Sequence, residues 1–427
     1  AKSVGGSPSN IAIGTARLGL RSALITRVGD EQMGRFVLEQ MAREGVSTKG
    51  IATDPARLTS LVLLAVESDK SFPLIFYRDN CADSALSEAD VSEDFIRSAA
   101  ALLVTGTHFA RAVNDKAQRK AMALAKKHGR RIVIDIDYRP NLWGLAGHGA
   151  GEERYIKSDM VTSHLQSILA DCDLIVGTEE EVHIAGGSED TLEALRTIRG
   201  LSKGVIVLKR GPMGCVVYPS AIPASLDGGI VGKGFPIEVY NVLGAGDAFM
   251  SGFLRGWLKN EPYEICATWA NACGAFAVSR LLCSPEYVTW EELQYFLKHG
   301  SPVKALRKDD NLNHIHHATT RRKAWPKLLA FAIDHRKELE DMADSVGADR
   351  ARIAPFKRLA MQAIARVADG KPGFGTLLDD TYGREAMFDA AKLGLWVGRP
   401  LEKPGSRPLQ FEHTQDVGSR LVDWPVD

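Results

Sequence analysis

The sequence has no excess of charge of either sign and no long apolar run. Its 53 Lys and Arg residues balance 53 Asp and Glu residues, so it lacks the broad positive field on which nucleic-acid and anionic-membrane binding depend. No apolar stretch approaches the ~20 residues that a membrane-spanning helix needs. We therefore expect neither a nucleic-acid partner nor a membrane partner.

Cysteine pairs at metal-binding spacing are also missing. The six cysteines form no Cys-x-x-Cys pair and have no histidine at zinc-finger spacing. They predict buried, reduced thiols of a cytoplasmic protein. The first residues carry neither an initiator Met nor a signal-peptide pattern. We interpret Ala1 as a point inside a longer gene product.

Residues 1–300 alternate short β-rich apolar runs with longer helical patterns, which is typical of an α/β protein with a mostly parallel, doubly wound sheet. The segment 58–80 is rich in Leu, Val, Ile and Phe around a polar break at 67–71. This pattern predicts a hairpin that projects from the sheet as a flap over a ligand. Strands are expected at 22–27, 101–105, 131–135, 174–176 and 205–208, and helices at 10–18, 33–44, 115–127 and 191–201.

Charged residues and histidines dominate residues 301–326, which we interpret as a linker between two domains. His314, His316 and His317 lie in this stretch. No cysteine or carboxylate set completes a metal site around them, so solvated side chains are the favoured interpretation. Residues 327–427 show a β-α-β opening, with strands at 327–333, 375–378 and 395–397 and helices at 338–345 and 356–369. They predict a partial (β/α) barrel, since a complete one takes about 250 residues.

The most informative motif is Gly244-Ala245-Gly246-Asp247, which leads from a short β-like piece into an amphipathic helix. Backbone N–H groups and the helix dipole at such a point form a site for phosphate oxygens. Asp247 beside them could accept a proton from an attacking hydroxyl. Taken alone, Asp247 could equally be a helix N-cap after a glycine turn.

Two further motifs accompany it. Gly5 and Gly6 form a second glycine-rich turn, with Asn10 where the next helix begins, and a Gly-Asp-x-x-x-Gly spans 29–34. In order and spacing these motifs resemble the two signatures of the PfkB (ribokinase-like) carbohydrate kinases, over about residues 1–300. The resemblance implies a ribokinase-like sheet with a small β-flap as lid, and ATP-dependent phosphorylation of a sugar.

The resemblance also implies a role for each matching residue. Asp247 matches the catalytic base, and Gly244, Ala245 and Gly246 match the anion hole for the transferring phosphate. Gly5, Gly6 and Asn10 match the sugar-binding turn, and Glu181 matches the residue that organises Mg²⁺. The residues that match the nucleotide site are Thr178, Lys209, Gly211, Gly214 and Asn271.

Three features depart from the family pattern. Thr178 stands where the family has Asn, and Asn241 stands where many members have Asp near a monovalent-cation site. The resemblance implies ATP and Mg²⁺ as cofactors. Because of Asn241, the dependence on a monovalent cation stays open. The family's first strand, which supplies an acidic contact to the sugar, would precede Ala1.

The substrate class is indicated by residues after the flap and after a core strand. Tyr77, Arg78 and Arg139 are similar to residues in kinases of keto-deoxy sugar acids, and most resemble those of myo-inositol catabolism. An Arg fork suits a carboxylate. Another sugar acid or a neutral sugar remains an alternative, as does a non-catalytic sugar-acid-binding protein. Because flaps in the family often pair, we expect a homodimer.

The tail has a resemblance of its own. Asp334-His335-Arg336 and Asp379-Asp380 follow strand patterns, and the region is similar to an aldolase-like (DUF2090-type) barrel fused behind some inositol-pathway kinases. The Schiff-base Lys of a class I aldolase would come from later strands. We therefore expect no aldol chemistry from residues 327–427.

Overall fold

The computed structural model describes residues 2–65, 73–147, 153–320, 325, 327–412 and 424–426. They belong to two compact units, 1–320 and 321–427, which we call the first and second units.

The first unit is built on a six-stranded sheet in the order β10-β9-β8-β7-β6-β5. The strands from β5 to β8 are parallel, whereas β9 is antiparallel to both of its neighbours. This confirms the mostly parallel sheet. The strand bounds are β5 (Ala101–Thr105), β6 (Arg131–Asp135), β7 (Leu174–Thr178), β8 (Val205–Lys209), β9 (Cys215–Tyr218) and β10 (Ile230–Gly232).

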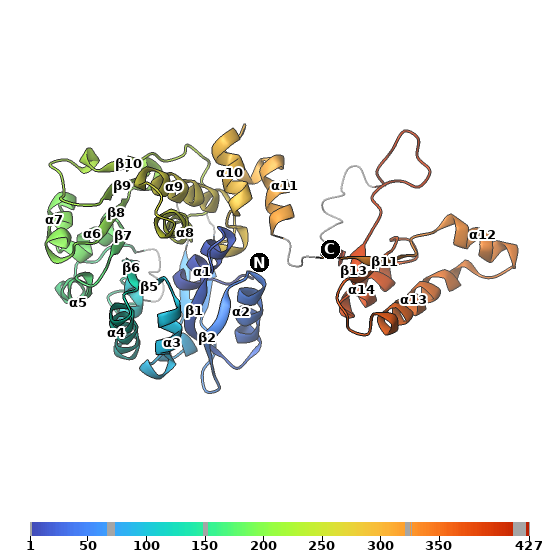
Figure 1. Cartoon of the computed structure of the whole chain (residues 1–427), viewed down its shortest axis with the longest axis horizontal. Coiled ribbons are helices and arrows are strands. Elements are labelled where there is room, and N and C mark those ends of the chain that lie inside the picture. The colour runs from blue at the N-terminus through green and yellow to red at the C-terminus, as the bar shows by residue number, and fades with distance from the viewer. Residues whose placement is uncertain are drawn as a thin grey trace. The chain divides into compact units, whose positions relative to one another are not determined.

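Helices cover both faces of this sheet (Figure 1). Side chains alternate along β6, so that Ile132 and Ile134 enter one hydrophobic cluster and Val133 enters the other. The first cluster includes α4 (Ala112–Lys127), α5 (Asp159–Leu169), α6 (Glu179–Gly186) and α7 (Thr191–Leu201), and the second includes α1 (Ser7–Arg17), α8 (Ala245–Leu258) and α9 (Tyr263–Ser279). The doubly wound ribokinase-like expectation is confirmed.

Two smaller strand pairs complete the framework of the site. The parallel pair is β1 (Ala23–Gly29) with β2 (Ser47–Asp54), followed along the chain by the flap, in which β3 (Leu61–Leu64) pairs antiparallel with β4 (Leu74–Tyr77). The polar break predicted at 67–71 lies outside the described residues. Helices α2 (Gln32–Arg43) and α3 (Glu93–Ser98) belong to the same region.

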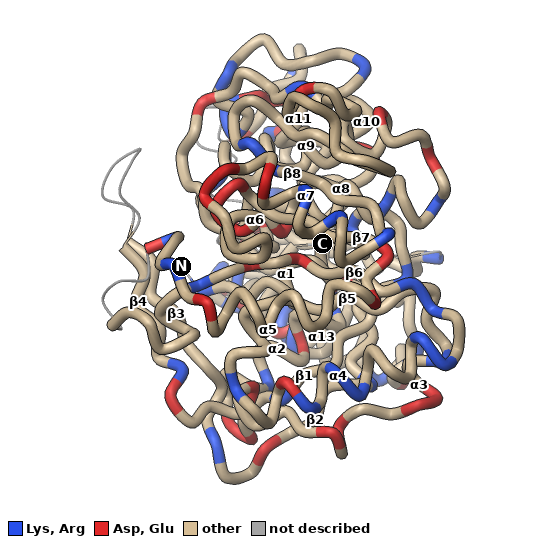
Figure 2. Tube along the Cα trace, turned by 90° about the vertical axis from the view of Figure 1, so that its left-hand side faces the viewer, with Lys and Arg blue, Asp and Glu red and all other residues tan. Residues whose placement is uncertain are grey.

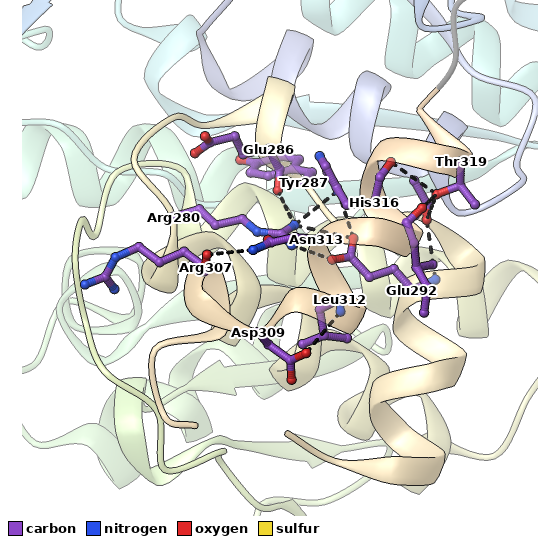
Figure 3. Close-up of polar contacts among 12 residues, drawn as sticks. Arg280, Glu286, Tyr287, Glu292, Arg307, Asp309, Leu312, Asn313, His316 and Thr319 are labelled. Atoms are coloured by element: carbon purple, nitrogen blue, oxygen red, sulfur yellow. Dashed lines mark hydrogen bonds and ion pairs between the residues drawn. The ribbon is translucent and has the colours of Figure 1, made fainter. Parts of the chain in front are cut away.

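The stretch expected to be a linker differs from that expectation. Residues up to 320 belong to the first unit, and α11 (Asp310–Thr319) packs against α10 (Trp290–His299). His316 Nδ1 lies 2.9 Å from Glu292 Oε2, which is buried (Figure 3). The interpretation of solvated histidines is thus wrong for His316, because this helix is packed against the first unit through the buried Leu312 and through the contact of His316 with Glu292.

The second unit contains a parallel three-stranded sheet in sequential order. Lys357 is fully buried and donates to Asp379 beyond the end of β12 and to the His335 carbonyl oxygen after β11. The elements are β11 (Leu329–Ala332), α12 (Lys337–Ser345), α13 (Ile353–Ala368), β12 (Phe374–Leu377), α14 (Arg384–Lys392) and β13 (Trp396–Gly398). A (β/α) barrel also begins with sequential parallel strands separated by helices. The partial barrel itself stays a prediction.

Charged residues of both signs are interspersed along the chain, as the balanced composition predicts. Figure 2 shows acidic and basic positions interspersed along the chain, with an acidic run at the start of α6. Among the described residues, no helix is both long enough and apolar enough to cross a bilayer. All six cysteines are buried and free.

Candidate active site

The N-terminus of α8 is shaped by a glycine that no other residue could replace without strain. Gly244 has φ 79°, in the left-handed region. A Cβ there would also lie 2.6 Å from Tyr287 Oη. The chain can therefore turn sharply into α8, leaving the first N–H groups of the helix without intrahelical partners. Such N–H groups and the helix dipole favour an anion.

Asp247 lies in the first turn of α8 and faces the start of α1. Asn10 Nδ2 donates to Asp247 Oδ2 at 2.8 Å, joining residues 237 positions apart. Burial raises the pKa of Asp247, although the Asn10 hydrogen bond acts in the opposite direction. The carboxylate is thus more basic than an exposed Asp, and its position is fixed by Asn10.

A buried Lys connects the ends of β6 and β8 with the first turn of α6, next to this helix. Lys209 Nζ, at the end of β8, lies 3.1 Å from Asp135 Oδ1 and 3.3 Å from Glu181 Oε2. Burial raises the pKa of Asp135 to about 7, with Lys209 opposing the shift. Burial disfavours the charged Lys209, but the two carboxylates outweigh it and raise its pKa. A Cβ on Gly246 would lie 3.4 Å from Lys209 Nζ, so this cation borders the α8 N-terminus.

Glu181 is held by a capping box at the start of α6. Thr178 N donates to Glu181 Oε2 at 2.7 Å, and Glu181 N donates to Thr178 Oγ1 at 3.3 Å. Thr178 therefore caps this helix in the position where the family has Asn. Among the residues that the structure describes, no three His, Cys, Asp or Glu side chains are grouped to hold a metal by themselves.

Asp137 and Arg139 follow β6 into the same cavity. Arg139 Nε lies 3.4 Å from Asp137 Oδ1. Burial raises the pKa of Asp137 to about 7, with Arg139 opposing the shift. Arg139 Nη1 is buried and makes no hydrogen bond within the described part of the chain. One edge of this guanidinium therefore remains available to an anionic ligand.

Arg78 differs from Arg139 because its fork is occupied. Its Nε and Nη2 both lie 2.6 Å from Asp83 Oδ2, and Nη2 also lies 2.8 Å from His108 Nε2. Burial and the Arg78 charge lower the pKa of His108 to about 3. His108 is neutral and accepts from Arg78 through Nε2, which leaves Nδ1–H to donate to Thr105 Oγ1 at 2.5 Å.

These groups line one cavity of about 1950 Å³ in the first unit. It also extends between β1 and β5, which belong to separate sheets in the described part of the chain. The expected site residues that line it are Gly5, Gly6, Asn10, Arg78, Arg139, Thr178, Glu181, Lys209, Gly244, Ala245, Gly246 and Asp247.

Four expected residues do not line this cavity: Tyr77, Gly211, Gly214 and Asn271. Tyr77 is 55% exposed at the end of β4 in the flap. Asn271 Nδ2 instead donates to the carbonyl oxygens of Gly232 and Lys233, at 2.9 and 3.1 Å. Gly214 has φ 91°, and a Cβ there would lie 2.0 Å from the Gly232 oxygen. Asn271 and Gly214 therefore both lie against the backbone at the end of β10.

The sequence did not single out Asp135, Asp137 or His108. A signal existed for the first two, because Asp135 ends and Asp137 follows a buried strand whose carboxyl end faces the ligand side of an α/β sheet. For His108 the signal is weaker, since it is one polar residue in the turn after β5.

Comparison with known proteins identifies the class. Residues 1–289 match the model of the pfkB family carbohydrate kinases. The chain belongs to this family and is an ATP-dependent carbohydrate kinase. Residues 292–427 match a second model, described as "Uncharacterized protein conserved in bacteria (DUF2090)".

Individual proteins within and around this family are also similar to the chain. The chain is 32% identical over 312 residues to 5-dehydro-2-deoxygluconokinase of Geobacillus kaustophilus, which covers 72% of this chain and 88% of that protein. A PfkB protein from Polaromonas sp. JS666 has TM-score 0.57 and 27% identity, covering 69% of this chain and 90% of that one. A fructokinase double mutant from Vibrio cholerae O395, in a fructose, ADP and potassium ion bound form, has TM-score 0.58 and 25% identity, covering 70% and 91%.

Proposed function

We propose that this kinase phosphorylates the terminal hydroxyl of a keto-deoxy sugar acid, and that 5-dehydro-2-deoxy-D-gluconate, yielding its 6-phosphate, is the preferred substrate. The observation that carries the proposal is Arg139 Nη1, a buried N–H donor that has no hydrogen-bond partner among the described residues and lines a cavity that also contains Asp247. A carboxylate would satisfy it with a charge-assisted hydrogen bond. The name of the Geobacillus relative supports the same substrate.

In the proposed reaction Asp247 accepts the proton of the sugar hydroxyl. The hydroxyl oxygen forms a bond to the γ-phosphorus of ATP, and the bond from that phosphorus to the ADP oxygen breaks. The N–H groups of Gly244, Ala245 and Gly246 and the Lys209 ammonium stabilise the negative charge on the transferred group. The raised pKa of Asp247 favours proton acceptance.

The remaining residues would bind and orient the two substrates. Gly5, Gly6 and Asn10 would hold the sugar, and Arg78 would border it through a fork already neutralised by Asp83. The exposed Tyr77, which does not line the cavity, would reach the sugar only through closure of the flap. We assign the nucleotide to Thr178 and Lys209, which line the cavity. On the family resemblance alone, we also assign it to Gly211, Gly214 and Asn271, which lie outside the cavity lining.

The acidic side chains fit a magnesium ion shared with the nucleotide. Glu181 and Asp135 present carboxylate oxygens, the hard donors that Mg²⁺ prefers. Neighbouring acids contribute to the raised pKa of Asp135, and a divalent cation would relieve that repulsion. We assign Mg²⁺ to Glu181, through water, where it would neutralise phosphate charge.

A substrate panel and one substitution test the proposal. We expect the highest kcat/KM for 5-dehydro-2-deoxy-D-gluconate, ahead of 2-dehydro-3-deoxygluconate, ribose and fructose. Asp247→Asn should lower kcat by about 10²- to 10⁴-fold, the usual contribution of a general base, with little change in ATP binding. Asp310→Asn is the matched control, because Asp310 is an exposed Asp in the first turn of α11. Activity of Asp247→Asn close to wild type would refute the base assignment.

We also propose that the flap mediates a homodimer. Leu61 faces Tyr77 and Leu63 faces Ile75 across the hairpin, so these four side chains share one face. All four are at least 42% exposed. An apolar face of this kind is typical of an interface between subunits.

A further inference from the structure

The loop of residues 280–287 supports the candidate anion site from behind. Tyr287 Oη donates to the Gly244 carbonyl oxygen at 2.6 Å, and Cys283 Sγ contacts the Leu243 carbonyl oxygen at 3.5 Å. Ser284 Oγ donates to the Val4 carbonyl oxygen at 3.0 Å, next to the Gly5–Gly6 turn. Displacement of this loop would therefore move both the turn into α8 and the turn proposed to hold the sugar.

Asn241 joins this loop to the segment before α8. Its side chain is fully buried, and Nδ2 donates to the Leu281 carbonyl oxygen at 2.8 Å. Its Oδ1 accepts from Leu243 N at 3.0 Å. The amide orientation is determined by these partners, because a carbonyl can only accept and a backbone N–H can only donate.

An Asp at this position could make only one of the two contacts. Its first oxygen would still accept from Leu243 N, but its second would face the Leu281 oxygen at about the 2.8 Å where Asn241 places its nitrogen. Two buried oxygens at that distance repel each other unless a cation or a proton lies between them. An Asp here thus requires a bridging cation or a proton on its carboxyl group, whereas the Asn N–H makes the bridge itself.

We propose that the Asn241 amide takes the place of a monovalent cation, so that phosphoryl transfer by this kinase needs no such ion. The cation implied by the family resemblance does not fit these contacts, because the Leu281 oxygen already receives an N–H and residue 241 carries no charge. The proposal rests on the proposed role of Gly244, to which the 280–287 loop is bonded.

The test compares cations at constant ionic strength. Sugar-acid phosphorylation is measured at pH 8 with Tris-ATP and MgCl₂, in KCl, NaCl or choline chloride. Wild-type kcat should vary less than about twofold. Asn241→Asp should lose at least tenfold in choline chloride and recover in KCl. Asn311→Asp adds the same charge on the exposed surface of α11 and should behave as wild type.

A second readout does not need turnover. Without substrates, the Tm of Asn241→Asp should rise with KCl at constant ionic strength, while the Tm of wild type and Asn311→Asp should not. A tenfold loss of wild-type activity in choline chloride would overturn the proposal, even if Asn241→Asp does not fold. Full activity of Asn241→Asp in choline chloride would also overturn it. Absence of turnover with any sugar in any salt would instead count against the proposed function, and the Tm titration would then decide the cation question.

Discussion

Arg280 and Glu292 form a buried ion pair between the end of α9 and the first turn of α10 (Figure 3). Their side chains are 5% and 0% exposed. Arg280 Nη1 also donates to the Glu286 carbonyl oxygen at 2.9 Å, and His316 contacts the other Glu292 oxygen. Arg280 lies in the stretch matched by the pfkB model and Glu292 in that matched by the DUF2090 model. The start of the second match is therefore part of the first compact unit.

Glu292→Gln should destabilise the first unit strongly. It leaves the buried Arg280 charge without its partner, which typically costs about 3–5 kcal/mol. Burial opposes ionisation of Glu292, but the His316 and Arg280 contacts lower its pKa below the ordinary value. Its contribution should thus be present at neutral pH and be lost as pH falls through that lowered pKa. Urea unfolding of wild type and variant at pH 7 measures the difference.

The control is Glu291→Gln, at the neighbouring exposed residue in the same helical turn. It experiences the same helix dipole and should change stability by less than about 1 kcal/mol. Equal effects of the two substitutions would show that the ion pair contributes little.

The acid limb of the activity profile should depend on Asn10. Asn10 lowers the pKa of Asp247 through its hydrogen bond, so Asn10→Ala should raise that pKa. A hydrogen bond to a charged group is worth about 1.5–3 kcal/mol. The acid limb of kcat/KM should therefore move to higher pH. Asn313→Ala removes an amide that donates to the Arg307 carbonyl oxygen at 2.8 Å, and should leave the limb in place. An unmoved limb in Asn10→Ala would refute Asp247 as the titrating base.

Arg139 should distinguish sugar acids from neutral sugars. If Nη1 of Arg139, which has no hydrogen-bond partner among the described residues, binds the carboxylate, Arg139→Ala should raise KM for the sugar acid about ten- to a hundredfold. The kinetics of a neutral sugar such as fructose should change little. Arg78→Ala should affect both sugars alike, because its fork already pairs with Asp83. Arg97→Ala, at a 58% exposed side chain, is the control. Equal losses for both sugars in Arg139→Ala would contradict the carboxylate-binding role of Arg139 and would favour a neutral sugar as the substrate.

The flap interface can be tested by mass. Leu63→Lys places a charge in the exposed apolar face and should convert a dimer into a monomer in light scattering. Met160→Lys places the same charge at a 57% exposed residue of α5 and should leave the mass unchanged. A monomeric mass for the wild type would contradict the proposed flap-mediated homodimer.

The sequence predicted those elements that a local pattern of apolar or glycine residues identifies. β5 and β6 appear at the predicted bounds because each is a continuous apolar run, and Asp247 was identifiable because its glycine turn is local. β2 (Ser47–Asp54) was missed, since few of its residues are apolar. The contact of His316 with Glu292 and the pairing of Lys209 with Asp135 join distant residues. Such contacts depend on strand order and helix packing, which local periodicity does not encode.

The buried cysteines also make the chain suitable for site-specific labelling. Burial raises the pKa of all six thiols, so at neutral pH almost no thiolate is available to react with maleimides. A new cysteine in place of Met213, which is 59% exposed in the turn after β8, would be accessible to such reagents. A fluorophore attached there would lie between Gly211 and Gly214, which we propose to contact the nucleotide, without removal of any native cysteine.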